Sequence, residues 1–290
     1  MPPRLPDQTF KFEKWQALGN DYLIVERRDL PFELTPARIR RLCEPHMGVG
    51  SDGVLLLDEP SQRGYVASLR IFNPDGSEAE LSGNGAREAI MYLRRRGWTD
   101  SDTFSIETAA GEIRPTITGP DTCRVDMGRA RLASKDFPSG GQDGTAAITV
   151  DGREFAFQHV SIGNPQCSIE VPDGLEELDL QTLGPPIESN PLFPSRTNVS
   201  FWREVGPGEI RARIFERGVG ETLSSGTGAS GAAVAYVLRG GDSPVTVHLD
   251  GGDLEVEVGE DLHVTLSGWA KQVYAATLSD EFIKELNETE

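Results

Sequence analysis

The sequence predicts an α+β protein built from two similar halves. LRIFN at 69–73, followed by SGNGAR at 82–87, recurs as ARIFE at 212–216, followed by SGTGAS at 225–230. Ser225 follows Ser82, and Arg213 follows Arg70, by the same 143 residues. Two ungapped copies half a chain apart indicate duplication. Strand-like stretches also outnumber helical ones at short spacing, which favours α+β over repeated βαβ units.

The predicted elements follow from local patterns. Alternating or β-branched stretches predict strands at 22–26, 54–57, 67–72, 146–150, 155–162, 211–215, 245–249 and 254–258. Helical periodicity predicts helices at 36–43, 85–96, 228–239 and 280–286. The third of these helices is small or apolar around most of its circumference, so we expect it to be buried. The proline-rich segments 184–186 and 190–194 are predicted to be loops.

Further repeated motifs support duplication of a whole domain. LGN at 18–20 returns as IGN at 162–164, and GEI at 111–113 returns as GDL at 252–254. The 290 residues are enough for two domains with separate cores. We expect an N-terminal domain at 8–137 and a C-terminal domain at 145–277, joined by a linker at 137–145, with the terminal strand able to pack back on the first domain.

Composition excludes several classes of function. The formal charge of −18 argues against nucleic-acid binding, which needs a basic surface. The three cysteines form no C-x-x-C motif and the histidines no ligand cluster, so no metal site is expected. Neither a signal peptide nor an 18-residue apolar run occurs, so we expect a cytoplasmic protein that does not bind membranes.

The duplicated glycine-rich turns are the predicted ligand-binding sites. At the start of each predicted helix the first backbone N–H groups lack intrahelical acceptors, and the helix dipole is positive. Glycine at 83, 85, 226 and 228 lets a ligand approach the backbone closely. Two such turns suit a small molecule with a carboxylate, and we expect them to share a cleft.

Several motifs together resemble one family. They are ALGNDY at 17–22, HMGVGSDG at 46–53, RIFNPDGSEAE at 70–80, GNGAR at 83–87, GNP at 163–165, ERGVGETL at 216–223 and GTG at 226–228. In this order, and spread over nearly the whole chain, they are similar to those of diaminopimelate epimerase.

The resemblance implies two pseudosymmetric domains, each a β-barrel-like sheet around a central helix. It also implies a cofactor-free epimerase that interconverts LL- and meso-diaminopimelate for lysine and peptidoglycan synthesis, acting as a homodimer. Ser82 and Ser225 occupy the catalytic positions. The implied substrate-binding residues are Asn20, Asn73, Gly83, Asn84, Asn164, Asn198, Glu216, Arg217, Gly226 and Thr227. Glu216 and Arg217 would grip the distal amino-acid centre.

The chain departs from the family pattern at the centre of the site. The pattern has cysteine at both catalytic positions and histidine after GNP, whereas this chain has Ser82, Ser225 and Gln166. A serine hydroxyl is a far weaker acid than a thiol and needs an adjacent base. Glu78, Glu221 and His46 are the candidate bases.

The sequence leaves alternatives open. Serine is a favoured helix N-cap, so Ser82 and Ser225 could serve as caps with or without proton transfer. Three functions fit the motifs: an epimerase of this family, a same-fold isomerase or lyase that uses carboxylates, as the phenazine-pathway isomerase does, and a non-catalytic binder of a dicarboxylic amino acid.

Overall fold

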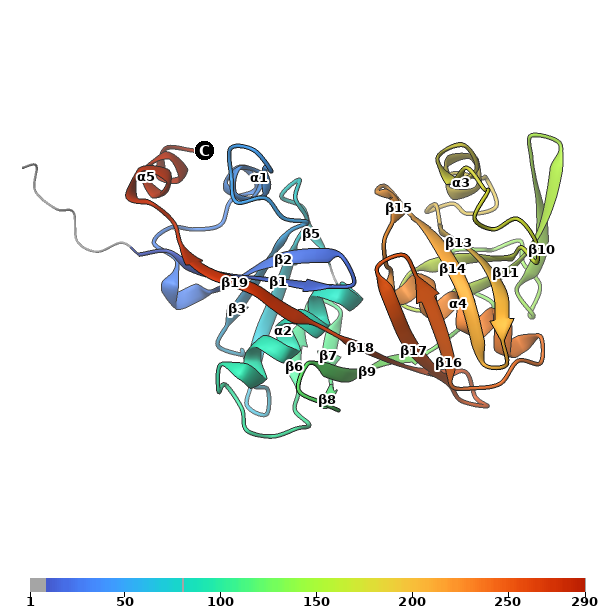
Figure 1. The fold of residues 1–290 in the computed structure, drawn as a ribbon, viewed down its shortest axis with the longest axis horizontal. Helices are drawn as coiled ribbons and strands as arrows, with labels where there is room; N and C mark the ends of the chain where they lie inside the picture. Colours follow the sequence, from blue (N-terminus) through green and yellow to red (C-terminus); the bar gives the residue numbers. More distant parts are fainter. Residues whose placement is uncertain (1–8, 80, 290) are drawn as a thin grey trace, which may run out of the picture. The chain divides into compact units, whose positions relative to one another are not determined.

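The computed structural model describes residues 9–79 and 81–289. The chain forms two compact units (Figure 1): unit 1 is Met1–Cys123 with Trp269–Glu290, and unit 2 is Arg124–Gly268. These boundaries differ from those of the two expected domains, 8–137 and 145–277. The chain leaves unit 1 inside an uninterrupted strand, β9 (Thr122–Arg129), and the glycine-rich loop near 140 lies within unit 2.

Unit 1 is built on a mixed sheet with the strand order β19-β1-β2-β3-β4-β6-β7, and β5 pairs with β4. The strands of this sheet are β1 (Lys11–Ala17), β2 (Asn20–Glu26), β3 (Val54–Asp58), β4 (Ala67–Phe72), β5 (Glu78–Ala79), β6 (Ile106–Thr108), β7 (Gly111–Ile113) and β19 (Lys271–Thr277). The short strand β8 (Thr116–Ile117) pairs with β9 and belongs to the other sheet. The helices of unit 1 are the 3-10 helix η1 (Arg27–Asp29), α1 (Pro36–Cys43), α2 (Gly83–Arg95) and α5 (Asp280–Glu288).

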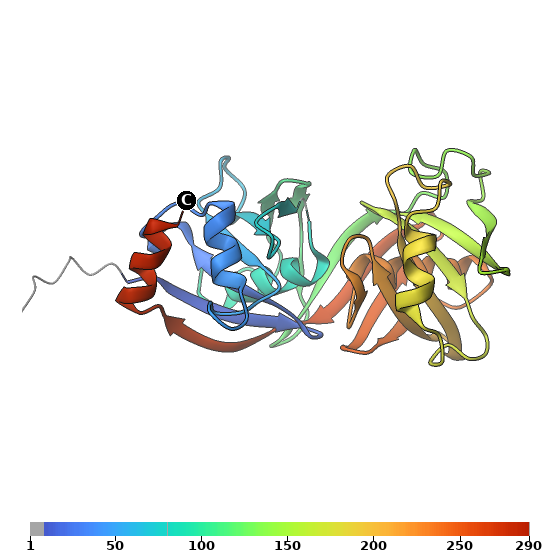
Figure 2. The ribbon, with the colours of Figure 1, turned by 90° about the horizontal axis from the view of Figure 1, so that it is seen from above.

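The two faces of this sheet carry different helices. Helices α1 and α5 lie side by side (Figure 2), where Leu42 and Ile283 join a core with Leu23 and Val54. Helix α2 packs against β1, β2 and β3, and ten of its residues are buried. The start of α2 is therefore held against the sheet by its own apolar surface.

Unit 2 repeats this design in a larger sheet of order β10-β11-β12-β13-β14-β16-β17-β18-β9-β8, with β15 paired to β14. Its further strands are β10 (Thr145–Val150), β11 (Arg153–Ser161), β12 (Pro165–Glu170), β13 (Asn198–Gly206), β14 (Glu209–Glu216), β15 (Gly220–Thr222), β16 (Val245–Leu249), β17 (Gly252–Val258) and β18 (His263–Trp269). Its helices are α3 (Leu180–Glu188) and α4 (Gly226–Leu238). Helix α4 is buried as expected, from Gly226 to Tyr236 with the exception of Thr227.

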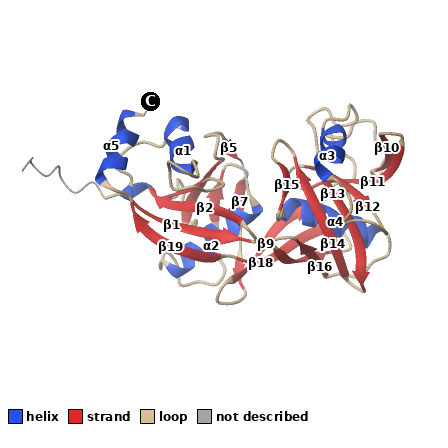
Figure 3. Ribbon diagram, turned by 45° about the horizontal axis from the view of Figure 1, so that its top comes forward, coloured by secondary structure: helices blue, strands red, loops and turns tan. Residues whose placement is uncertain are grey.

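The strand pairings show the duplication directly. From β1 through β7 the successive neighbours in the sheet pair antiparallel, parallel, antiparallel, parallel and antiparallel. From β11 through β17 the order of directions is the same. Strands outnumber helices in both units (Figure 3), so the predicted α+β class is confirmed.

One local prediction was wrong. The segment 184–186 is not a loop, because Pro185 and Pro186 lie inside α3. The helix forms because Asp179 caps its start, accepting from the N–H groups of Gln181 and Thr182, and because its apolar side is buried in the core of unit 2. Capping and burial outweigh the backbone hydrogen bonds that two prolines remove.

Matching hairpins lead into α2 and α4. Phe72 pairs with Glu78 between β4 and β5, and Phe215 pairs with Glu221 between β14 and β15. Each hairpin ends a few residues before the serine that precedes a helix, at Ser82 and at Ser225. Hairpin geometry therefore sets where each serine lies.

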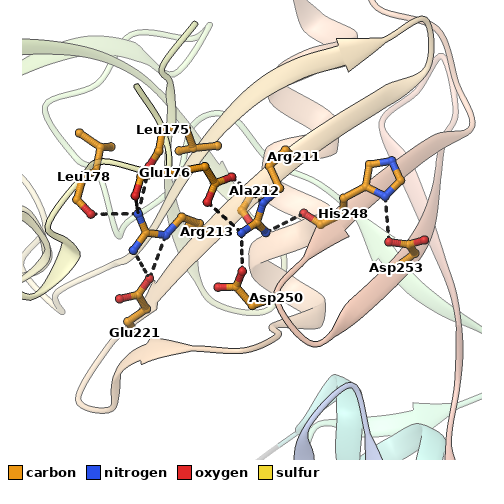
Figure 4. Close-up of polar contacts among 10 residues, drawn as sticks. All are labelled: Leu175, Glu176, Leu178, Arg211, Ala212, Arg213, Glu221, His248, Asp250 and Asp253. Atoms are coloured by element: carbon orange, nitrogen blue, oxygen red, sulfur yellow. Dashed lines mark hydrogen bonds and ion pairs between the residues drawn. The ribbon is translucent and has the colours of Figure 1, made fainter. Parts of the chain in front are cut away.

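An arginine–glutamate pair fastens each hairpin. Arg70 donates to both carboxylate oxygens of Glu78, at 2.8 and 2.7 Å. In unit 2 the Arg213 guanidinium donates to Glu221 at 3.0 and 2.6 Å (Figure 4). The same guanidinium also donates to the carbonyls of Leu175 (3.0 Å), Glu176 (3.3 Å) and Leu178 (2.9 Å). Arg213 thus also holds the loop that contains Leu175 and Leu178 against the hairpin.

We predict that Arg213→Met destabilises the protein more than Arg70→Met. Arg213 is 13% exposed and Arg70 is 46% exposed. Loss of Arg213 leaves partly buried carbonyls and a carboxylate without their donor, so it should cost about 2–3 kcal/mol, whereas the exposed pair should contribute about 1 kcal/mol or less. Urea denaturation of both variants beside the wild type measures this. Equal losses would contradict the difference in role.

Candidate functional site

Ser82 marks the start of α2. Its backbone is extended, with φ −129° and ψ 124°, and its Oγ accepts the Gly85 N–H at 3.1 Å. This is the N-cap interaction that serine makes at helix starts. The hydroxyl of Tyr22, on β2, donates to the same Oγ at 3.3 Å. The oxygen is half-buried and is held from two sides.

Ser225 repeats this arrangement in unit 2. Its φ is −146° and its ψ 121°, and its Oγ accepts the Gly228 N–H at 3.1 Å. Helices α2 and α4 each have 13 residues and begin one residue after their serine. Each unit therefore presents a serine oxygen at the positive end of a largely buried helix.

The third residue of each glycine-rich turn, Gly85 or Gly228, packs closely against a strand. A Cβ at Gly228 would lie 2.8 Å from Cγ2 of Ile214, and one at Gly85 would lie 3.1 Å from Cδ2 of Leu55. Both values are below ordinary van der Waals separation. The glycine lets the helix start sit directly on the strand that carries the hairpin in unit 2, and on β3 in unit 1.

The asparagines expected to bind substrate in unit 1 are held by neighbours. The Asn20 amide donates to Asp52 at 2.8 Å, and the Asn73 amide donates to Ser77 Oγ at 2.9 Å. Asn84, in the first turn of α2, is 5% exposed, and its Oδ1 accepts from buried Arg87 at 2.5 Å. Ser82, Gly83 and Asn84 thus form one group, while Asn20 and Asn73 lie at the start of β2 and just after β4.

In unit 2 a chain of amides reaches the start of α4. The Gln166 amide donates to Asn164 Oδ1 at 2.6 Å, and the Asn164 amide donates to Thr227 Oγ1 at 3.2 Å. Gln166 is fully buried. The structure therefore brings two predicted binding residues, Asn164 and Thr227, together, with Gln166 fixing the orientation of the Asn164 amide.

Asn198 and Arg217 are also brought together. The Asn198 Oδ1 accepts the Arg217 N–H at 2.7 Å, and the Arg217 guanidinium donates to the Ser195 carbonyl at 2.9 Å. The next residue, Gly218, donates its N–H to Glu188 at 2.8 Å. These bonds fix the loop between β14 and β15, from which the Arg217 side chain extends.

Glu216 is the neighbour of Ser225 that the sequence reasoning assigned elsewhere. The resemblance gave it to the distal end of the substrate, and the Ser225 hydroxyl is also near enough to its carboxyl to lower the pKa of that carboxyl. Burial raises the pKa of Glu216 above its ordinary value, and the hydrogen bond from Ser225 offsets part of this rise. A carboxylate with a raised pKa next to a hydroxyl is a suitable proton acceptor.

Two of the three bases expected from sequence, Glu78 and Glu221, have an arginine as partner. Glu78 is bound by Arg70, whose hydrogen bonds lower the pKa of the Glu78 carboxyl. Glu221 is bound by Arg213. The backbone N–H of His46 donates to Glu44. The nearness of Glu216 and Tyr22 to the serines could not be predicted from local sequence. Glu216 precedes Ser225 by 9 positions and Tyr22 precedes Ser82 by 60, and both lie on strands.

Three further features concern residues 9–79 and 81–289: metal-ligand groups, cysteines and apolar helices. Within these ranges no group of three or more His, Cys, Asp or Glu side chains could hold a metal ion. The three cysteines are buried and unpaired, and burial raises the pKa of the Cys43 thiol to about 11. Across the same ranges, no helix has both the length and the apolar character needed to cross a bilayer.

Comparison with known proteins identifies the family. The sequence model of the family described as diaminopimelate epimerase matches residues 12–133 and 158–273. Diaminopimelate epimerase 2 of Nostoc sp. is 42% identical over 276 residues, covering 93% of this chain and 96% of the relative. Diaminopimelate epimerase of Pelotomaculum thermopropionicum is 43% identical over 275 residues, covering 91% of this chain and 97% of the relative.

Solved structures share the fold at low identity. A probable proline racemase from Agrobacterium radiobacter K84 superposes with a TM-score of 0.69 at 17% identity, covering 96% of this chain and 95% of the other. A hydroxyproline epimerase from Agrobacterium vitis gives 0.67 at 16% identity, covering 94% and 93%. With matched residues in both halves and relatives above 40% identity over most of its length, the chain belongs to the diaminopimelate epimerase family.

Proposed function

We propose that this protein is a cofactor-independent epimerase that interconverts LL- and meso-diaminopimelate, with Ser82 and Ser225 as its proton-transfer groups. The observation that carries the proposal is the serine oxygen at a glycine-rich helix start in each unit. Family membership supports the substrate, since the relatives are named for it. Epimerisation needs two groups that exchange a proton with opposite faces of one carbon, and a duplicated chain supplies two.

Carboxylate binding is assigned to the helix starts. Backbone N–H groups of Gly83, Asn84, Gly226 and Thr227 lie in the first turns of α2 and α4, where the dipole favours negative charge. The same groups would stabilise the charge that develops on the carboxylate as the α-proton leaves. Arg217, with its planar guanidinium, would bind the second carboxylate of the substrate.

Glu216 makes the serine chemistry feasible in unit 2. Ser225 takes the α-proton while its own hydroxyl proton passes to the Glu216 carboxylate, so no free alkoxide accumulates. The raised pKa of Glu216 improves it as a proton acceptor. The protein is therefore not limited to the acidity of an isolated alcohol.

The structure disfavours a mechanism based on Glu78 and Glu221. Both carboxylates are held by an arginine, and that pairing lowers the pKa of Glu78. An arginine-bound carboxylate with a low pKa is a poor base. These two residues fit better as parts of the hairpins that hold the serines in place.

We predict that the wild-type protein incorporates deuterium at the α-carbon of LL-diaminopimelate in D₂O and forms the meso isomer. Ser82→Ala or Ser225→Ala should lower the rate of epimerisation by about 10²–10⁴. Ser279→Ala is the matched control, because Ser279 caps α5 by accepting the Phe282 N–H at 3.2 Å without any proposed chemistry. Absence of exchange in the wild type, together with exchange in the Ser82→Cys/Ser225→Cys variant, would leave a binding protein instead.

We also predict a pH dependence set by Glu216. Its carboxyl must be deprotonated to accept the proton, and its pKa is raised, so kcat/KM should increase with pH through a pKa above the ordinary value for glutamate. Glu216→Gln should remove this acidic limb and slow the reaction by about 10²-fold or more. Glu221→Gln, five positions away, should retain the limb. A pH profile unchanged in Glu216→Gln would exclude the assigned role.

A further inference from the structure

Tyr22 is a buried residue whose hydroxyl the mechanism above does not use. It lies on β2, is 5% exposed, and donates to Ser82 Oγ at 3.3 Å. Building on the proposed function, we propose that Tyr22 is a positioning residue that acts through Ser82, holding its hydroxyl in place and resupplying it with a proton. Ser82 remains the group that contacts the substrate.

The Tyr22 ring is held in a fitted space. A Cβ at Gly53 would lie 2.7 Å from its Cε1, and one at Gly85 would lie 3.3 Å from its Cε2. Glycine on both edges of the ring allows it to lie against the first turn of α2. The phenol therefore reaches Ser82 from a fixed direction, which is what a proton relay requires.

The second half of the chain has no such phenol at the repeated position. LGN at 18–20 corresponds to IGN at 162–164, so Tyr22 corresponds to Gln166. The Gln166 amide donates to Asn164, and the group whose pKa responds to the Ser225 hydroxyl is the Glu216 carboxyl. The position of Glu216 corresponds in turn to Asn73. One serine thus has a proton donor beside it, and the other has a proton acceptor.

The chemistry follows from this difference. When the Ser82 O–H bond breaks and a new C–H bond forms at the substrate's α-carbon, the oxygen would be left as an alkoxide. A phenol, with a pKa near ~10, is a much stronger acid than an aliphatic alcohol. The Tyr22 proton passes to Ser82 Oγ as the Ser82 proton leaves, and the phenolate then recovers a proton from water. In the opposite direction the same protons move in reverse.

The test is a double-mutant cycle between Tyr22 and Ser82. Tyr22→Phe removes only the phenolic oxygen, and it is made in the wild type and in Ser82→Cys. We expect the epimerisation rate to fall about 10–100-fold in the wild-type background. It should change less than about twofold in Ser82→Cys, because a thiol, with a pKa near ~8.5, needs no phenol to resupply it.

Tyr92→Phe is the matched control. It removes another buried phenol, which donates to Glu26 at 2.8 Å from the opposite end of α2, and it should leave the rate per folded molecule unchanged. Binding of LL-diaminopimelate, measured by calorimetry, should be similar in wild type and Tyr22→Phe.

Each remaining outcome overturns the inference in a recognisable way. Equal losses in both backgrounds would show that Tyr22 only supports the fold, while full activity of Tyr22→Phe would show that Ser82 needs no relay, and in both cases the proposed function stands. If the wild type exchanges no deuterium while Ser82→Cys/Ser225→Cys does, the proposed function fails and this inference fails with it.

Discussion

The hydrogen bond from a glycine N–H to a serine Oγ at the start of a buried helix is the interaction on which each unit depends. It is made by Gly85 with Ser82 and by Gly228 with Ser225, at 3.1 Å in both cases. It begins the helix and also fixes the serine oxygen at the positive end of the dipole. Helix stability and the proposed proton transfer therefore rely on the same atoms.

The rest of each unit keeps that oxygen in place. The sheet buries α2 or α4, and a hairpin fastened by an arginine–glutamate pair delivers the chain to the serine. Duplication explains why the scaffolds match. It does not require the immediate neighbours of the serines to match: a phenol, Tyr22, donates to Ser82, whereas the carboxyl of Glu216 has its pKa lowered by Ser225.

Replacing a thiol by a hydroxyl changes what the surroundings must provide. A thiol, with a pKa near ~8.5, can exchange a proton by itself, whereas an alcohol depends on a partner that accepts or supplies its proton. The carboxyl of Glu216 has a raised pKa and adjoins one serine, and the phenol of Tyr22 adjoins the other. These partners make an epimerase with two serines chemically coherent.

Sequence alone predicted much of the fold. The α+β class and the helices beginning near Pro36, Gly85, Gly228 and Asp280 follow from periodicity, capping residues and the repeat. Helix α3 was missed because local proline signals outweighed the repeat, which places α1 and α3 in equivalent connections between parallel strands.

The site was predictable only in part. The serines and glycines stand next to one another in the chain, so their grouping followed from the sequence. The partners of the serines come from strands elsewhere in each unit, and the sequence carries no local mark of those contacts. For the same reason Glu78 and Glu221 were considered as bases, although each is bound by the arginine across its hairpin.

The most direct test of the central claim is the NMR response of the helix starts to ligand. Titration of ¹⁵N-labelled protein with LL-diaminopimelate should shift the amide resonances of Gly83 and Asn84 in α2, and of Gly226 and Thr227 in α4, with one common affinity. Shifts confined to one of the two helix starts, or absent from both, would contradict the account.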